Sequence, residues 1–218
     1  MIFQYPIKPF RLLYPSALWR MEGAGDAVFL TFDDGPIPES TPWILDTLSR
    51  YDVKATFFVV GDNIRKQPDI FEELIQQGHM VGNHSYHHLR AKKCSVDEYL
   101  ADIALAQEAI VAAYEECHLA YPLGKDAKPL FRPPHGVIPR KHYQAVAEKY
   151  RIVQWDVVTR DYNRHVSAAH ILHTIQTYAR PGSIINIHDS LRSIDKLHSA
   201  LPAALNWLLQ QGYTFKTL

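Results

Sequence analysis

The sequence predicts an α/β domain in which about seven short parallel strands alternate with helices and form a barrel-like sheet. Three observations predict this fold. Short apolar runs rich in β-branched and aromatic residues alternate with segments of helical periodicity, as in parallel α/β folds. No Gly-rich phosphate fingerprint follows a strand, which favours a barrel over a dinucleotide-binding sheet. The 218 residues suffice for one sizeable core, so a single domain is expected.

The first half of the chain contains three predicted strands and three predicted helices. The strands are expected at 27–32 (AVFLTF), 53–60 (VKATFFVV) and 79–83. The helices are expected at 40–50, with Ser40 or Thr41 as N-cap, at 68–77, ending at Gly78, and at 95–116. Ser95 followed by Glu98 is a capping-box pattern that marks the start of the third helix.

The second half continues the alternation. Strands are expected at 130–131, 151–157 (RIVQWDV), 183–188 (SIINIH) and 213–217. Helices are expected at 139–150, 167–179 and 194–211, the second of them closed by Pro181-Gly182. We expect residues 27–218 to form the catalytic domain and residues 1–26 to form an N-terminal extension packed on it.

Composition and charge exclude several kinds of partner. Basic and acidic side chains balance at 23 each, without a basic stripe, so neither nucleic acid nor an anionic membrane surface is expected as a partner. No run approaches the roughly 20 apolar residues of a membrane span. The first 14 residues lack the uninterrupted apolar region of a signal peptide. The chain as sequenced is expected to be cytoplasmic, with export of a longer precursor left open, and its oligomeric state is undetermined.

Ionisable residues gather where the predicted strands end. These clusters are Asp33-Asp34-Gly35-Pro36, Asn83-His84-Ser85-Tyr86-His87-His88, Arg132-Pro133-Pro134-His135-Gly136, Arg160-Asp161-Tyr162 and His188-Asp189. The carboxyl ends of parallel strands lie on one rim, where active sites form in such folds. We therefore expect these clusters, far apart in the sequence, to meet.

One carboxylate and two histidines suggest a catalytic metal site. Asp34, His84 and His88 supply three N/O ligands, and a fourth position stays open for water, as in catalytic zinc centres. Taken singly, the Asp pair is equally compatible with a solvated turn, and the His pair with ordinary surface or core histidines. His87 is a competing candidate for the place of His88. Zinc is the expected ion, and cobalt or nickel would also suit these ligands.

A hydrolytic site also needs a base and an acid. Asp33, beside Asp34, is placed to be the base, and His188 is a candidate acid because histidine titrates near neutrality. Arg132 and Asp161 are candidates for a charge pair that orients them. The alternative for this pair is a purely structural salt bridge.

Five ordered motifs resemble those of the polysaccharide deacetylases, carbohydrate esterase family four. They are Thr31-Phe32-Asp33-Asp34-Gly35, His84-Ser85-x-x-His88, Arg132-Pro133-Pro134-x-Gly136, the segment around Asp161, and His188-Asp189. The resemblance extends from about Val28 to the C-terminus, and it implies a distorted (β/α) barrel.

The resemblance also implies roles for individual residues. Asp33 would be the catalytic base, and Asp34, His84 and His88 would bind the metal. His188 would be the acid. Arg132 would orient Asp33, and Asp161 would tune His188.

Four positions depart from the family pattern, and three of them, His135, Tyr162 and Asn186, are candidates for substrate binding. His135 stands where the family usually has an aromatic residue whose backbone N–H helps to hold the oxyanion. Tyr162 replaces a Trp, Val158 replaces an Asp, and Asn186 stands near the expected acetyl pocket, where an apolar residue is usual. Trp155 fits a core-facing pattern, so packing is expected of it rather than sugar stacking. The departures bear on substrate identity more than on the type of reaction.

The sequence thus predicts a metal-dependent hydrolase that removes N-acetyl groups from a GlcNAc-containing glycan or a related acetylated sugar. An O-acetyl esterase and an amidase acting on a small non-sugar substrate are the closest alternatives. A non-catalytic glycan-binding domain is the alternative from another class; Asp33 and His188, which such a domain would not need, argue against it.

Overall fold

Eight short strands form one parallel sheet in the computed structural model of the protein, which describes residues 11–123 and 127–218. Seven of them follow the order β5-β4-β3-β2-β1-β7-β6, and β8 pairs with β1. Their bounds are β1 (Ala27–Asp33), β2 (Thr56–Val59), β3 (Met80–Asn83), β4 (Leu130–Phe131), β5 (Arg151–Ile152), β6 (Val157–Val158), β7 (Ile184–His188) and β8 (Thr214–Phe215). The sheet curls into a half-barrel, which confirms the predicted distorted barrel.

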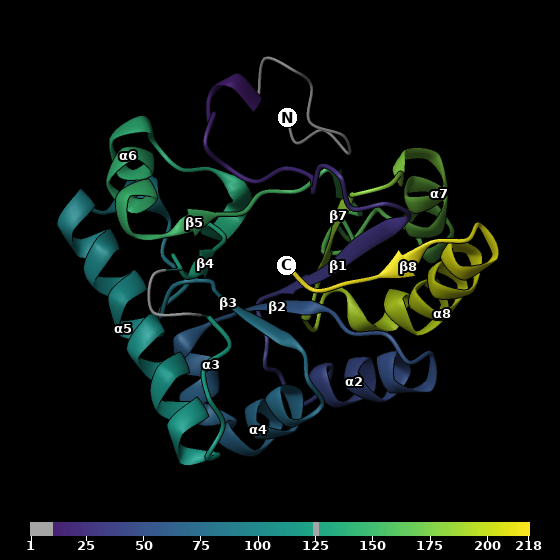
Figure 1. Ribbon diagram of the computed structural model, residues 1–218, viewed down its shortest axis with the longest axis horizontal. Helices are drawn as coiled ribbons and strands as arrows, with labels where there is room; N and C mark the ends of the chain where they lie inside the picture. Colours follow the sequence, from purple (N-terminus) through teal and green to yellow (C-terminus); the bar gives the residue numbers. More distant parts are fainter. Residues whose placement is uncertain (1–10, 124–126) are drawn as a thin grey trace.

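Helices surround the sheet (Figure 1). They are α2 (Thr41–Arg50), α3 (Gly61–Lys66), α4 (Pro68–Gln76), α5 (Val96–Glu116), α6 (Arg140–Lys149), α7 (Ala168–Tyr178) and α8 (Ile194–Gln210). The main core lies between the central strands and these helices, and every residue of β1 is buried. The predicted capping box is present: the Ser95 hydroxyl accepts the Glu98 N–H, and the Glu98 carboxylate accepts the Ser95 N–H. In the described ranges no helix is long and apolar enough to cross a membrane.

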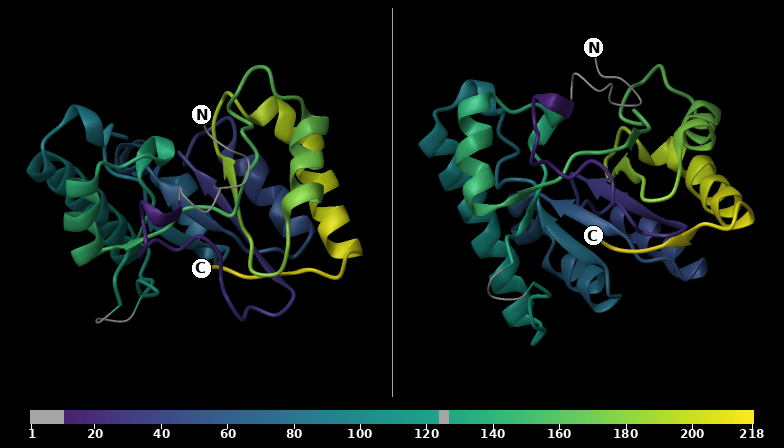
Figure 2. Two further views of the ribbon diagram at one scale, coloured as in Figure 1. Left: turned by 90° about the horizontal axis from the view of Figure 1, so that it is seen from above. Right: turned by 45° about the horizontal axis from the view of Figure 1, so that its top comes forward.

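The segment that precedes β1 crosses the concave side of the sheet (Figure 2). Leu18 pairs with Val153 beside β5, and Arg20 pairs with Ser183 at the start of β7. Tyr14 and Trp19 are buried. This segment therefore links the end of β5 to the start of β7.

Two predicted strands differ from the structure, and one observed helix was not predicted. The strand expected at 151–157 is two strands, because the chain leaves β5 at one end of the sheet and joins β7 through β6 near the other. The strand expected at 53–60 is shorter: the N–H of Val53 bonds back to the last turn of α2, and the N–H of Ala55 donates to the ring of His79. Helix α3 was not predicted, because its six residues are too few to show a periodic pattern.

Candidate active site

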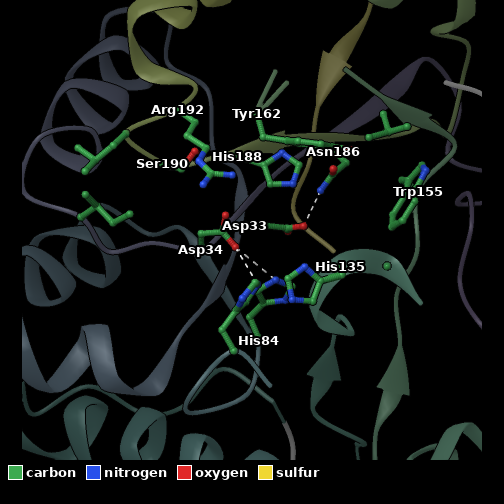
Figure 3. Close-up of a pocket in the computed structure, with 15 residues that line it drawn as sticks. Asp33, Asp34, His84, His135, Trp155, Tyr162, Asn186, His188, Ser190 and Arg192 are labelled. Atoms are coloured by element: carbon green, nitrogen blue, oxygen red, sulfur yellow. Dashed lines mark hydrogen bonds and ion pairs between the residues drawn. The ribbon is translucent and has the colours of Figure 1, made fainter. Parts of the chain in front are cut away.

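The predicted strand-end clusters meet at one rim of the sheet. Asp33 lies directly beside His188 in the pairing of β1 with β7, and Asn83 lies beside Phe131 in that of β3 with β4. A pocket of about 420 Å³ opens there (Figure 3). The predicted site residues that line it are Asp33, Asp34, His84, His88, His135, Tyr162, Asn186 and His188. The other two, Arg132 and Asp161, are fully buried behind this lining.

Both carboxylate oxygens of Asp33 accept a buried hydrogen bond. Nη1 of Arg132 donates to Oδ1 at 2.7 Å, and Nδ2 of Asn186 donates to Oδ2 at 2.7 Å. The guanidinium of Arg132 also donates to Thr31 and to the carbonyl of Gln154, and it stacks 4.1 Å from the centre of the Phe58 ring. Asp33 is therefore held rigidly. Each of its oxygens retains a lone pair, because a carboxylate offers about four acceptor positions.

The charge pair expected between Arg132 and Asp161 is absent from the structure. Arg132 pairs with Asp33, and Asp161 pairs with His188. The reason is topological: Arg132 follows β4 and reaches past β3 and β2 to Asp33 at the end of β1, whereas Asp161 follows β6 on the far side of β7. The pairs that the family resemblance implies are the ones observed.

Asp34, His84 and His88 converge on one point. Oδ1 of Asp34 lies 3.5 Å from Nε2 of His84 and 3.2 Å from Nε2 of His88, and the ligand atoms all lie within 4.8 Å of one another. Burial would raise the pKa of Asp34, but the two imidazoles, with His188 nearby, hold it well below its usual range. Asp34 can therefore face a cation as a carboxylate.

Unusual backbone conformations occur at Asp34 and His88 and directly after His84. Asp34 has a φ of 85°, and Ser85 and His88 have φ values of 64° and 55°. Such values are uncommon for residues other than glycine, and they persist only where neighbouring contacts enforce them. Asn63 provides one such contact, since its side-chain amide donates to the carbonyl of Asp34 at 2.8 Å.

Helix α5 fixes the loop that carries the two histidines. Oδ2 of Asp102 accepts the backbone N–H groups of Tyr86 and His87, and Oδ1 lies 2.5 Å from Nδ1 of His87. His87 thus contacts Asp102 and is not part of the cluster around Asp34. Asp102 was not predicted from the sequence, although a signal was available: this acidic residue lies among the buried positions of α5, beside Ile103.

His188 and Asp161 form the second buried pair. Nδ1 of His188 lies 2.9 Å from Oδ1 of Asp161, whose Oδ2 accepts the backbone N–H of His188 at 2.8 Å. Burial alone would lower the pKa of His188, but the charge and hydrogen bond of Asp161 raise it to about 9. Burial opposes ionisation of Asp161 as well, yet contact with His188 holds the pKa of this carboxyl below its usual value. His188 is therefore an imidazolium at neutral pH.

Asp189 supports the turn that carries Asp34. Its carboxylate accepts hydrogen bonds from the hydroxyls of Ser40 and Thr41, and a Cβ on Gly35 would lie 2.0 Å from its Oδ2. The sequence suggested Ser40 or Thr41 as the N-cap of α2. The Ser40 hydroxyl bonds to Asp189 instead, and no side chain caps this helix. Burial raises the pKa of Asp189 to about 7.

The open side of the pocket combines predicted and unpredicted residues. The rings of His135 and His88 lie 4.6 Å apart, and those of Tyr162 and His188 lie 4.7 Å apart. Trp155 packs on Gly136, as its core-facing pattern predicted, but it also lines the pocket. Three further residues that line the pocket after His188-Asp189 were not predicted from the sequence: Ser190, Leu191 and Arg192. Their proximity to that motif was the only available signal.

The family model for polysaccharide deacetylase matches residues 20–153. The chain belongs to the polysaccharide deacetylase family. Its fold and the order of its motifs along the chain agree with this membership.

Two curated relatives in the polysaccharide deacetylase family illustrate the range of substrates. A peptidoglycan-N-acetylglucosamine deacetylase of Bacillus cereus is 37% identical over 199 residues, which cover 88% of this chain and 66% of the relative. A chitooligosaccharide deacetylase of Bradyrhizobium is 34% identical over 164 residues, which cover 75% of this chain and 70% of the relative. The chain thus spans slightly less than two thirds of the Bacillus protein.

Solved structures of the family share the fold. A peptidoglycan N-acetylglucosamine deacetylase in complex with 4-naphthalen-1-yl-N-oxidanyl-benzamide is 33% identical, with a TM-score of 0.82 over 98% of this chain and 95% of the other. A family pseudoenzyme from Bacillus anthracis is 26% identical, with a TM-score of 0.78 over 94% of this chain and 68% of the other. Family membership alone therefore does not establish activity, which depends on the residues of the site.

Proposed function

We propose that the protein is a metal-dependent deacetylase that hydrolyses the N-acetyl group of a GlcNAc residue in a glycan. One observation carries the proposal: a carboxylate and an imidazolium line the same pocket as Asp34, His84 and His88, which could hold a metal ion. Asp33 is a carboxylate fixed by Arg132, and His188 is an imidazolium fixed by Asp161. A pair of groups with opposite protonation states suits general base and general acid catalysis.

The geometry of Asp34, His84 and His88 fits a divalent metal better than it fits a hydrogen-bonded cluster. Ligand atoms bound about 2.0–2.1 Å from a tetrahedral ion lie roughly 3.4 Å apart. The contacts of Asp34 with the two imidazoles are 3.5 and 3.2 Å, longer than the usual charge-assisted hydrogen bond of about 2.8 Å. Nδ1 of His84 lies 2.7 Å from the carbonyl oxygen of Arg132, so it donates there and leaves Nε2 as a ligand. Zinc suits this set, as do cobalt and nickel.

The residues of the chain then divide the reaction between them. A metal held by the three ligands would polarise the acetamide carbonyl and lower the pKa of water. Asp33 removes the proton from the attacking water, and the backbone N–H of His135 donates to the developing oxyanion. His188 protonates the leaving nitrogen, which cannot depart as an amide anion. Asp161 keeps His188 charged for this step.

Acetate release from a panel of substrates tests the proposal. The panel comprises chitotetraose, peptidoglycan, an O-acetylated xylan and a small aryl acetamide, each assayed before and after chelator treatment and after metal is restored. We expect release from the first two substrates, lost with the chelator and recovered with metal. Release from the xylan or the aryl amide alone would establish an esterase or a small-molecule amidase instead. Glycan binding without release of acetate from any substrate would establish a non-catalytic domain.

A further inference from the structure

One charged side chain in the pocket has no part in the proposed chemistry. Arg192 is the only lysine or arginine among the described residues that line the pocket. Figure 3 shows its guanidinium turned toward the pocket on the side of Ser190 and His188. It makes no hydrogen bond or ion pair with any other described residue, whereas Arg132 pairs with Asp33, and Lys196 donates to the carbonyls of Asp161 and Asn163.

The loop that carries Arg192 is fixed at both ends. At one end Asp189 is fully buried, and its N–H donates to the carbonyl of Asp33 at 2.8 Å. At the other end the N–H groups of Ser193 and Ile194 both donate to the carbonyl of Ser190, at 3.0 and 3.1 Å. The backbone of Arg192 is therefore anchored, while its side chain is exposed at the mouth of the pocket.

The charges around the pocket do not provide Arg192 with a partner. The buried carboxylates Asp33 and Asp161 are each matched by a cation, and a divalent metal would overcompensate Asp34. The acetamide that the proposed reaction consumes is neutral, so it does not need a guanidinium. The planar fork of arginine binds carboxylates in a bidentate manner, and lysine does not reproduce that geometry.

We propose that Arg192 binds a carboxylate of the substrate, carried by the sugar next to the GlcNAc that loses its acetyl group. This inference rests on the proposed function and refines it, because it favours an acidic glycan such as peptidoglycan over a neutral chitooligosaccharide. In peptidoglycan the carboxylate has two sources: the lactyl group of a muramic acid residue without a peptide stem, or the stem peptide itself.

Matched substrates test the proposal and separate these sources. The first is a stem-free GlcNAc–MurNAc tetrasaccharide with free lactyl carboxylates. The second is the same tetrasaccharide with those carboxylates converted to methylamides, and the third carries peptide stems. The quantity measured is kcat/KM for each charged substrate divided by that for the methylamide. This ratio is compared between wild type and the variants Arg192→Gln and Arg192→Lys. The control is Arg151→Gln, which makes the same charge change on an exposed residue at the start of β5.

We expect wild type to prefer a charged substrate by about five- to twentyfold, as for a partly exposed charge-assisted pair. Arg192→Gln should reduce the ratio to near one through KM, Arg192→Lys should give an intermediate ratio, and Arg151→Gln should leave the ratio unchanged. A preference for the stem-free substrate identifies the lactyl group, and one for the stem-bearing substrate identifies the stem. An unchanged ratio in Arg192→Gln, or equal losses on charged and methylamide substrates, would overturn the proposal.

Binding measurements separate the role proposed for Arg192 from the proposed deacetylase function. Titration calorimetry of the charged tetrasaccharides and of the methylamide with wild type and Arg192→Gln requires no turnover. A charge preference that Arg192→Gln abolishes supports the role of Arg192 even if no acetate is released, in which case only the proposed function fails. Equal binding of the charged and methylamide tetrasaccharides by wild type overturns the role of Arg192 even if the enzyme is active.

Discussion

The pair formed by His188 and Asp161 yields a quantitative prediction for the variant Asp161→Asn. The pKa of His188 is about 9 in the folded protein, against an ordinary histidine value of about 6.5. The difference corresponds to about 3 kcal/mol in favour of the imidazolium. Asparagine keeps the size of the aspartate side chain but removes its charge, so the opposing effect of burial remains and the pKa should fall to about 6.5 or below.

The change in pKa predicts a loss of activity that depends on pH. The proposed reaction requires protonated His188, so its rate falls as the pH rises through the pKa of this residue. At pH 8 the protonated fraction is about 90% for a pKa of 9 and about 3% for a pKa of 6.5, a loss of about thirtyfold. At pH 6 the same comparison gives a loss of less than about twofold. The defect of Asp161→Asn should therefore nearly disappear in mildly acidic buffer.

The assay is kcat/KM for acetate release between pH 5.5 and 9.5. A metal held by Asp34 would offset the charge of that carboxylate, which raises the pKa of His188, and it would do so in both proteins. The displacement between their alkaline limbs is therefore the quantity compared. Thr159→Val is the matched control: it removes the hydroxyl that donates to Oδ1 of Asp161 at 2.8 Å but leaves the charge. Its alkaline limb should remain close to that of wild type. A curve for Asp161→Asn that is lower at every pH, with its alkaline limb unmoved, would refute the reasoning.

Four further predictions concern other parts of the site. Asp33→Asn should keep metal and fold but lower kcat by about 10²–10⁴-fold, and a near-normal kcat would remove this residue from the mechanism. The double variant His84→Ala/His88→Ala should lose the one bound divalent ion per chain in metal analysis, so full occupancy would contradict the assignment. His188→Ala should impair amide substrates more than activated esters, whose leaving groups need the proton less; equal losses would argue against a leaving-group acid. The pKa of Asp189 is raised to about 7 in the folded state, so folding favours its protonated form. This contribution to stability is complete below about pH 4 and is lost as the pH rises to about 7. Between about pH 4 and 7 the free energy of unfolding in urea should therefore change less for Asp189→Asn than for wild type, by up to about 4 kcal/mol. Identical pH profiles for the two proteins would show that the pKa of this carboxyl does not change on folding.

The convergence of the site could be predicted because it follows from strand direction. Asp33, His84 and His188 lie in or directly after β1, β3 and β7. Parallel strands bring their carboxyl ends to one rim whatever the details of packing. The cluster of Asp34, His84 and His88 could be predicted for the same reason. It needed one further inference, that two histidines four residues apart can bind the same metal ion.

The partners of Arg132 and Asp161 could not be assigned from residue types alone. Two cations and two carboxylates near one rim can be paired in more than one way, and the choice depends on which strands are neighbours. The break after β5 was hidden for a similar reason. Residues 153–156 look like a continuing strand, but Gln154 donates its N–H to the carbonyl of Leu18, far away in the sequence. Local propensity cannot register such tertiary contacts.

Three of the four departures from the family pattern have different consequences once their contacts are known. His135 and Tyr162 present rings at the open side of the pocket, where a change of side chain alters the surface offered to a glycan. Asn186 is buried instead, and its side-chain N–H group is already engaged with Oδ2 of Asp33. It therefore acts on the proposed base and offers that donor to no substrate group. A substitution of Asn186 should accordingly alter the rate for every substrate together, whereas substitutions of His135 or Tyr162 should alter the order of preference among them.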